Sequence, residues 1–191
     1  MQESSPSIQK AFDWLEQENG IDFLLPEEHC PVRDVFQSRA NKMVIECSTI
    51  SSIADKAYLL GLVAGEIGNN SFDHNLGNWR DEKGTYFIFN ISERVIVIAD
   101  RGSGVLCTLR NVRPSIADDC EALTTAFTET LSGRAPENRG NGLKLVAKVV
   151  REQKWKLVYC SGRGIYTIDS TIASCTVPEK NIDGMVAVLF F

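Results

Sequence analysis

The sequence predicts an α/β sandwich, a fold in which helices pack against a β-sheet. A long helical pattern over residues 51–76 is followed by two β-rich runs, at residues 85–90 and 94–99. A further helix and three more β-rich runs occupy the last third of the chain. The 191 residues, of which 43% are hydrophobic, are enough for one domain with its own core.

Two short helices are expected within residues 1–50. The first covers residues 6–20, because a proline suits its first position and a glycine suits its end. Residues 21–33 contain two prolines and indicate a connection. Residues 34–40 favour a second short helix. We therefore interpret residues 1–50 as a helical N-terminal extension that packs on the core or on a partner.

The main domain is expected at residues 51–191 and opens with the helix over residues 51–76. Apolar residues recur in this helix at every third or fourth position, and Ser51 or Ser52 can serve as its N-cap. Only three residues separate the two β-rich runs that follow, and this short spacing predicts a β-hairpin.

The remainder of the domain alternates between loop, helix and strand patterns. Residues 105–140 are polar and irregular, apart from one helix expected at residues 121–131. A glycine-containing stretch then precedes an amphipathic helix at residues 143–152. Three expected strands complete the domain, at residues 156–160, 164–170 and 185–191.

The charge is unevenly distributed along a chain whose formal net charge is −5. Residues 1–100 carry a net charge of −8, whereas residues 101–191 carry +3. An acidic chain is poorly suited to neutralising nucleic-acid phosphates, so we expect no direct nucleic-acid binding. Seven basic residues lie between Arg134 and Lys156. They fit either a solvated helix face or a local anion site, and the neighbouring motifs must decide.

The cysteines and the N-terminus indicate a cytoplasmic protein. Six cysteines occur without a C-x-x-C pair, and the chain has only two histidines, so zinc-ligand spacing is absent. We expect free, mostly buried thiols in a reducing compartment. The N-terminus lacks the basic start and apolar run of a signal peptide. No stretch approaches the ~18 apolar residues of a membrane span.

The first of three short motifs falls near the end of the long helix. Four polar residues stand at offsets that place them on one helical face: Glu66, Asn70, Asp73 and His74. An amide oxygen can bind Mg²⁺, and a carboxylate one turn away can accept a proton from an attacking hydroxyl group. A polar stripe that faces solvent is the alternative interpretation.

The second motif directly follows the β-rich run at residues 94–99 and reads Asp100-Arg101-Gly102-Ser103-Gly104. An aspartate at a strand end can accept a hydrogen bond from an exocyclic amine. The glycines permit close approach of a backbone to a ligand and allow positive φ angles. A simple turn is the alternative, since D-x-G sequences are common in turns.

The third motif opens the helix at residues 143–152 and reads Arg139-Gly140-Asn141-Gly142-Leu143-Lys144. Glycines at a helix N-terminus leave backbone N–H groups free to bind an anion, and the helix dipole supports this binding. Arg139 and Lys144 add positive charge that suits phosphate oxygens. A glycine loop before an amphipathic helix is the alternative.

Together, the order and separation of these motifs resemble the GHKL ATPases, the superfamily of gyrase, histidine kinases and MutL. The resemblance covers about residues 50–191. It comprises an N box (Glu66 to His74), a first glycine box (Asp100 to Gly104) and a second glycine box (Gly140 to Leu143). It implies the Bergerat fold, a two-layer α/β sandwich whose mixed, mostly antiparallel sheet is covered on one face by helices.

The resemblance also implies roles for individual residues when Mg²⁺ and ATP bind. Glu66 would be the general base, and Asn70 would coordinate the Mg²⁺ that bridges the phosphates. Asp100 would bind the adenine amine, with Gly102 and Gly104 passing beneath the adenosine.

A lid over about residues 105–139 would close on ATP, with Arg134 as a candidate for contact with the γ-phosphate. The other implied ATP contacts are Asp73, Arg139, Gly140, Asn141, Gly142, Leu143 and Lys144.

One departure concerns adenine binding. The superfamily often has a Gly-Thr pair at the start of its last strand, where this chain has Gly184-Met185. Thr167 on the preceding expected strand is a candidate substitute.

The resemblance leaves three functions open. The N box, Glu66-x-x-x-Asn70-x-x-x-His74, is similar to that of bacterial anti-sigma serine kinases, which implies transfer of the γ-phosphate to a partner's serine or threonine. With Asp73 included, it is also similar to the gyrase and MutL type, which implies ATP hydrolysis. The third option is an ATP-gated protein-interaction switch with little turnover. A protein partner is expected in each case, and a homodimer is one option because the related kinases tend to dimerise.

Overall fold

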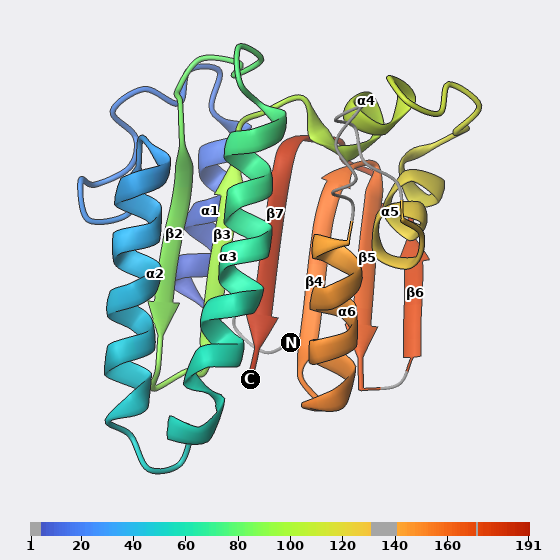
Figure 1. Ribbon diagram of the computed structural model, residues 1–191. Helices are drawn as coiled ribbons and strands as arrows, with labels where there is room; N and C mark the ends of the chain where they lie inside the picture. The colour runs from blue at the N-terminus through green and yellow to red at the C-terminus, as the bar shows by residue number, and fades with distance from the viewer. Residues whose placement is uncertain (1–4, 131–140, 171) are drawn as a thin grey trace.

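A computed structural model describes residues 5–130, 141–170 and 172–191 of the chain. Its centre is a seven-stranded sheet in the order β1-β2-β3-β7-β4-β5-β6, and every pair of neighbouring strands is antiparallel (Figure 1). The strands are β1 (His29–Cys30), β2 (Thr85–Asn90), β3 (Val95–Asp100), β4 (Lys156–Gly162), β5 (Gly164–Asp169), β6 (Ile172–Thr176) and β7 (Ile182–Phe190).

Helices α2, α3 and α6 cover one face of this sheet, and α5 lies near its β5–β6 edge (Figure 1). The helices are α1 (Pro6–Glu16), α2 (Arg33–Ser48), the short 3₁₀ helix η1 (Ala54–Lys56), α3 (Ala57–His74), α4 (Gly104–Arg110), α5 (Asp119–Thr128) and α6 (Gly142–Glu152). The α/β sandwich predicted from the sequence is therefore confirmed.

Strand β3 shows why the sheet is buried on two sides. Ile96 and Ile98 pack into the core beneath α2, α3 and α6, whereas Val95, Val97 and Ala99 pack into a second cluster on the opposite face. All six residues of β3 are buried. A strand covered on both faces gives a continuous apolar run rather than an alternating pattern, as the sequence shows here.

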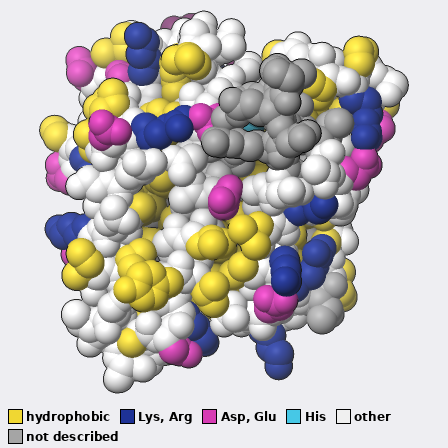
Figure 2. Space-filling view, viewed as in Figure 1, with side chains coloured by type: hydrophobic (Ala, Val, Ile, Leu, Met, Phe, Trp, Pro, Cys, Tyr) yellow, Lys and Arg dark blue, Asp and Glu magenta, His cyan; other side chains and the backbone are white. Residues whose placement is uncertain are grey.

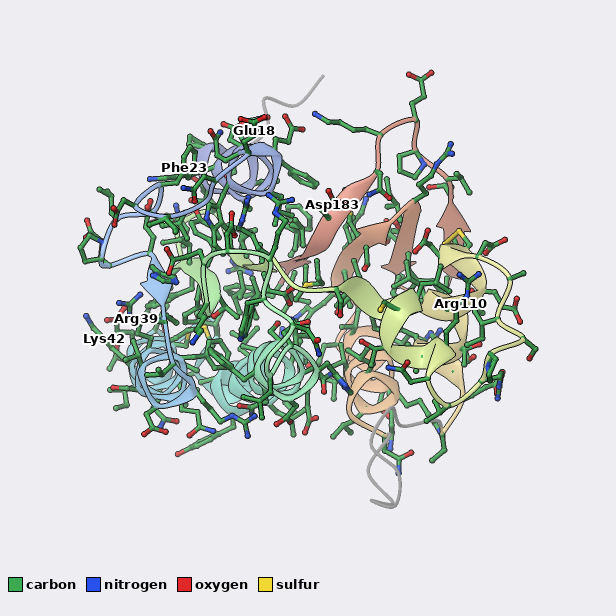
Figure 3. All side chains as sticks on the ribbon, turned by 90° about the horizontal axis from the view of Figure 1, so that it is seen from above. Glu18, Phe23, Arg39, Lys42, Arg110 and Asp183 are labelled. Carbon is green, nitrogen blue, oxygen red and sulfur yellow. A yellow bond between two sulfur atoms is a disulfide. The ribbon has the colours of Figure 1, made fainter. Side chains whose placement is uncertain are left out.

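Helix α1 supplies the cover on that opposite face. Ala11, Trp14 and Leu15 are its buried residues, and the helix contacts β3 and β7. Seen from above, α1 lies on one side of the sheet and α2, α3 and α6 lie on the other (Figure 3). Residues 1–50 therefore contribute one helix to each side of the sheet. The division of the chain at residue 50 remains a prediction.

Two predicted helices differ from those observed. Helix α2 runs to Ser48, well beyond residue 40, because Phe36, Ala40, Met43 and Cys47 recur at helical spacing and are buried. The long helix begins later than residue 51, since η1 precedes α3 and Lys56 occupies the N-cap position. The expected capping by Ser51 or Ser52 is therefore wrong.

Three elements were not expected. Strand β1 is only two residues long and pairs with the start of β2. Strand β6 pairs with β5 in a stretch that the sequence analysis left without an element. Helix α4 begins within the first glycine box and occupies part of the segment expected to be an irregular lid.

A disulfide between Cys120 of α5 and Cys175 of β6 corrects the expectation that all cysteines are free. Cys30, Cys47 and Cys160 are free and buried, whereas Cys107 is free and exposed. The cytoplasmic expectation rested partly on free thiols and loses that support. Within the described residues, no helix is both long and apolar enough to cross a bilayer.

Replacing Cys175 with serine should lower the free energy of unfolding by roughly 2–4 kcal/mol, since the bridge constrains the unfolded chain. Urea denaturation of the oxidised protein, followed by circular dichroism, measures this change. Cys107→Ser is the matched control, because it removes an exposed free thiol and should shift stability by less than about 0.5 kcal/mol. Equal urea midpoints for Cys175→Ser and the oxidised wild type would contradict the prediction.

Candidate functional site

Helix α3 connects the two ends of the candidate site. Glu66 and Asn70 lie near the start of α6, whereas Ser71 and Asn75 lie beside the end of β3. Asn70 and Ser71 are consecutive residues and so project in different directions around the helix. The site therefore has two regions, one beside the first glycine box and the other beside the second.

Asp100 lies at the centre of the end of the site beside the first glycine box. It is the last residue of β3 and is 3% exposed. One of its carboxyl oxygens accepts a hydrogen bond from the Gly102 N–H at 2.9 Å. Burial raises the pKa of the Asp100 carboxyl above its usual range, while the neighbouring Ser71 and Asn75 side chains and the Gly102 N–H oppose that rise.

The loop after Asp100 fits closely against the end of α3. The Asn75 side-chain oxygen accepts a hydrogen bond from the Ser103 N–H at 3.2 Å. A Cβ atom at Gly102 would lie 2.1 Å from the Asn75 side chain, so only glycine fits there without rearrangement. Gly104 adopts a φ of +76°, which favours glycine. Both glycines of the first box therefore meet a local requirement.

A row of three residues crosses the sheet at this end. Met185 of β7 pairs with Asp100 on one side and with Ser161 of β4 on the other. The Ser161 hydroxyl donates to the Gly184 carbonyl at 3.0 Å and accepts from the Val105 N–H at 3.0 Å. Ser161 thereby ties the first glycine box to the start of β7, a role that the sequence analysis missed.

Thr167, the candidate substitute for the missing threonine, lies elsewhere. It pairs with Val158, three residues before Ser161 on β4. Its neighbours in sequence, Tyr166 and Ile168, point into the core beneath the helices, so Thr167 points to the opposite face. Thr167 therefore lies outside the row of Asp100, Met185 and Ser161 and on the other face of the sheet, which does not favour it as the substitute.

The second end of the site lies where α3 meets the start of α6. A Cβ atom at Gly142 would stand 2.4 Å from a Glu66 carboxyl oxygen and 3.9 Å from the Asn70 side-chain nitrogen. The absence of a side chain at Gly142 thus lets Glu66 and Asn70 approach the helix N-terminus. Backbone N–H groups in the first turn of a helix lack intrahelical partners, so this place suits an anion.

Hydrogen bonds join the end of α5 to the start of α6. The Lys144 ammonium group donates to the Thr130 hydroxyl at 2.7 Å, and that hydroxyl donates to the Asn141 side-chain oxygen at 3.1 Å. Leu143 instead packs against the core. Thr130 was missed by the sequence analysis because its partners are more than ten residues away.

The remaining candidate residues have different settings. Asp73 forms an ion pair with Arg33 at the start of α2. The two carboxylates of the N box, Glu66 and Asp73, therefore lie in different settings. His74 is the last residue of α3. Three candidates lie outside the described residues: Arg134, Arg139 and Gly140.

Comparisons with known proteins give a likeness of fold. No family model and no curated protein matches the chain. Among solved structures, the chain is similar to the 43K ATPase domain of Thermus thermophilus gyrase B, crystallised in complex with an aminocoumarin. The TM-score is 0.42 and the sequence identity 13%, with 67% of this chain and 32% of that chain covered. The match thus spans about a third of that structure.

Asp100→Asn should stabilise the ligand-free protein at neutral pH. Burial raises the pKa of Asp100 in the folded state, so its carboxylate weakens folding once the pH exceeds the unfolded-state pKa. The advantage of asparagine should reach a plateau above the folded-state pKa and vanish below the unfolded-state pKa of about 3.9. Urea denaturation of both proteins from pH 3 to pH 8 measures it. A constant difference across that range would exclude titration of Asp100 as the cause.

Proposed function

We propose that this chain is a Mg²⁺-dependent ATP-binding protein of the GHKL type that uses Glu66 as a general base. The observation that carries the proposal is that α3 serves both ends of the site. It presents Ser71 and Asn75 to the buried Asp100, and it presents Glu66 and Asn70 to the start of α6. An elongated ligand with a hydrogen-bonding base at one end and phosphates at the other fits this arrangement.

The Asp100 end suits an adenine ring. A buried carboxylate whose neighbours are neutral groups retains the capacity to accept a hydrogen bond from an exocyclic amine. Met185 lies next to Asp100 and is buried, so it offers apolar contact where the superfamily often has threonine. Ser161, which stands in the same row across the sheet, holds the backbone on either side of Met185 and Asp100 through its hydrogen bonds to Gly184 and Val105.

The Gly142 end suits phosphates. The first-turn N–H groups of α6, which have no partners within the helix, the ammonium group of Lys144 and the close approach allowed by Gly142 all favour a polyanion. The Asn70 amide would contribute an oxygen ligand to Mg²⁺, a cation that prefers oxygen. When bound with ATP, Mg²⁺ supplies neutralisation of the phosphate charge.

The position of Glu66 supports a role as the base. Its carboxylate stands at the start of α6, and it is partly exposed rather than fully buried. It would orient an attacking hydroxyl group and accept its proton during transfer of the γ-phosphate. That hydroxyl belongs either to water, giving an ATPase, or to a serine or threonine of a partner, giving a protein kinase.

An ATP-gated switch is the alternative function. The Thr130 hydroxyl joins Asn141 and Lys144 at the start of α6, so a phosphate bound there would compete for Lys144. Competition of this kind would transmit ligand binding to the end of α5 without turnover.

A protein partner or a second copy of the chain would provide the acceptor or the switched surface. Apolar side chains gather over the helical face in Figure 2. The large exposed ones on α2, α3 and α6 are Ile45, Tyr58, Leu62 and Leu145.

Glu66→Gln should abolish most γ-phosphate transfer while leaving ATP affinity within about threefold of wild type. Glutamine keeps the shape of the side chain but cannot accept the proton, and general-base catalysis contributes roughly 10²–10⁴-fold. Release of free phosphate from γ-labelled ATP measures hydrolysis, and incorporation of the label into protein from added cell extract measures transfer to a protein acceptor. Glu152→Gln on the exposed end of α6 is the matched control. Unchanged turnover in Glu66→Gln would exclude Glu66 as the base.

Asn70→Ala should remove the Mg²⁺-dependent part of ATP affinity, because the variant lacks the amide oxygen. Calorimetric titration with ATP, in the presence of Mg²⁺ or of a chelator, measures the dependence. A variant that retains the full effect of Mg²⁺ would rule out Asn70 as a ligand. If wild-type protein binds ATP without any turnover, the switch is favoured over the enzyme.

A further inference from the structure

Arg101, the residue after Asp100, is charged and yet completely buried, with 0% exposure. Its guanidinium forms a bidentate ion pair with Asp81, with separations of 2.7 and 2.5 Å. It also donates to the backbone carbonyls of Trp14 and Gln17, the latter at 3.0 Å. The charge lies 5.8 Å from the centre of the Trp14 ring, within the range of a cation–π contact.

Burying a charge in this way is costly unless every donor finds a partner. Each of the three guanidinium nitrogens donates to at least one partner, and these partners come from two directions. Asp81 is held in place by the Gly20 N–H at 2.8 Å, and Arg101 holds the pKa of Asp81 well below its usual range. The site therefore keeps a negative charge opposite Arg101 throughout the ordinary pH range.

The position of Arg101 in the chain links this cluster to the candidate site. Asp100 points toward α3, and Arg101 points to the opposite side of the sheet, where α1 lies. The Arg101 carbonyl accepts a further hydrogen bond from the Arg80 N–H at 3.0 Å. The chain at the end of β3 is thus held by contacts on both sides of the sheet.

The segment after α1 is shaped around the guanidinium. A Cβ atom at Gly20 would lie 2.5 Å from the Arg101 Nε atom, so a side chain there would displace it. Glu18 and Phe23, which flank Gly20 in the sequence, lie on the α1 side of the sheet (Figure 3). The contacts of Arg101 therefore depend on the N-terminal segment as well as on the loop that carries Asp81.

We propose that Arg101 is a positioning residue that couples residues 14–20 to the placement of Asp100 and of the first glycine box. Within the proposed function, on which its nucleotide consequence rests, this coupling makes recognition of the adenine base depend on the N-terminal segment. Arg101 itself touches no ligand. Loss of its fork of donors should loosen the loop that contains Gly102 and Ser103, and the loosened Asp100 should discriminate less well between adenine and other bases.

Arg101→Lys is the principal variant, because lysine keeps the charge but loses the planar fork. Hydrogen exchange of the Gly102 and Ser103 N–H groups, which bond to Asp100 and Asn75, reports directly on the loop. We expect exchange about tenfold faster at these two positions, measured relative to amides at the centre of β7, where exchange follows global unfolding. Gly20→Ala is a milder second variant that displaces the guanidinium without removing it, and it should act in the same direction.

Tyr86→Phe is the matched control. The Tyr86 hydroxyl donates to the Ser7 carbonyl at 3.0 Å, so its loss weakens the attachment of the N-terminal segment without touching Arg101. Exchange at Gly102 and Ser103, relative to β7, should be unchanged in this variant. Equal acceleration in Arg101→Lys and Tyr86→Phe, or none in Arg101→Lys and Gly20→Ala, would overturn the proposal.

The nucleotide measurement separates the inference from the proposed function. Titration with ATP and GTP should show that Arg101→Lys lowers the preference for ATP by about tenfold, whereas Tyr86→Phe keeps the wild-type preference. If the wild type binds no ATP, the proposed function fails, but the exchange comparison still decides whether Arg101 positions the loop. If exchange accelerates while the ATP preference is unchanged, the coupling does not reach base recognition and that part of the inference is overturned.

Discussion

The fold depends on how the end of β3 accommodates two consecutive charged residues that are both buried. Each guanidinium nitrogen of Arg101 has a partner within this chain, through Asp81 and two backbone carbonyls, and the charge also lies over the face of Trp14. Asp100 has only neutral neighbours, and burial raises the pKa of its carboxyl group. One side of the strand end is thus a completed structural contact. On the other side, the Asp100 carboxyl group can still accept a hydrogen bond, as a binding site requires.

Helix α3 lies beside Asp100 and also positions residues at the opposite end of the site. Along α3, residues one turn apart face different partners because α2 and α6 flank the helix on either side (Figure 1). Glu66 and Asn70 stand at the start of α6, while Asp73 is drawn to Arg33 on α2. A polar stripe that looks uniform in sequence is therefore divided between a candidate site and a structural ion pair.

The division of the polar stripe between two roles could not be predicted from the sequence. Five strands were recognised because β-branched and aromatic residues are concentrated in them. Strand β1 was missed because two residues carry no periodicity, and β6 because four of its five residues are exposed. Helix α2 was predicted too short, although Met43 and Cys47 continue its apolar spacing.

Contacts between segments that are distant in sequence could not be predicted from local patterns. The partners of Arg101 lie 20 and more than 80 residues away, and the cysteines of the disulfide are 55 residues apart. Within the D-x-G motif, Arg101 looked like an ordinary turn residue because nothing nearby indicated its burial. The placement of Ser161 beside Met185 likewise follows from strand register, which sequence periodicity does not determine between strands that are not consecutive in the chain.

The strand order carries a kinetic consequence. Strand β7 is last in sequence among the strands, yet it lies between β3 and β4 near the middle of the sheet. Until it docks, β1–β3 and β4–β6 are two separate ribbons with unpaired inner edges. Helix α1 contacts the same strand from near the other end of the chain. The transition state must therefore bring together segments of very large sequence separation, so folding should be slow and highly cooperative for a domain of this size.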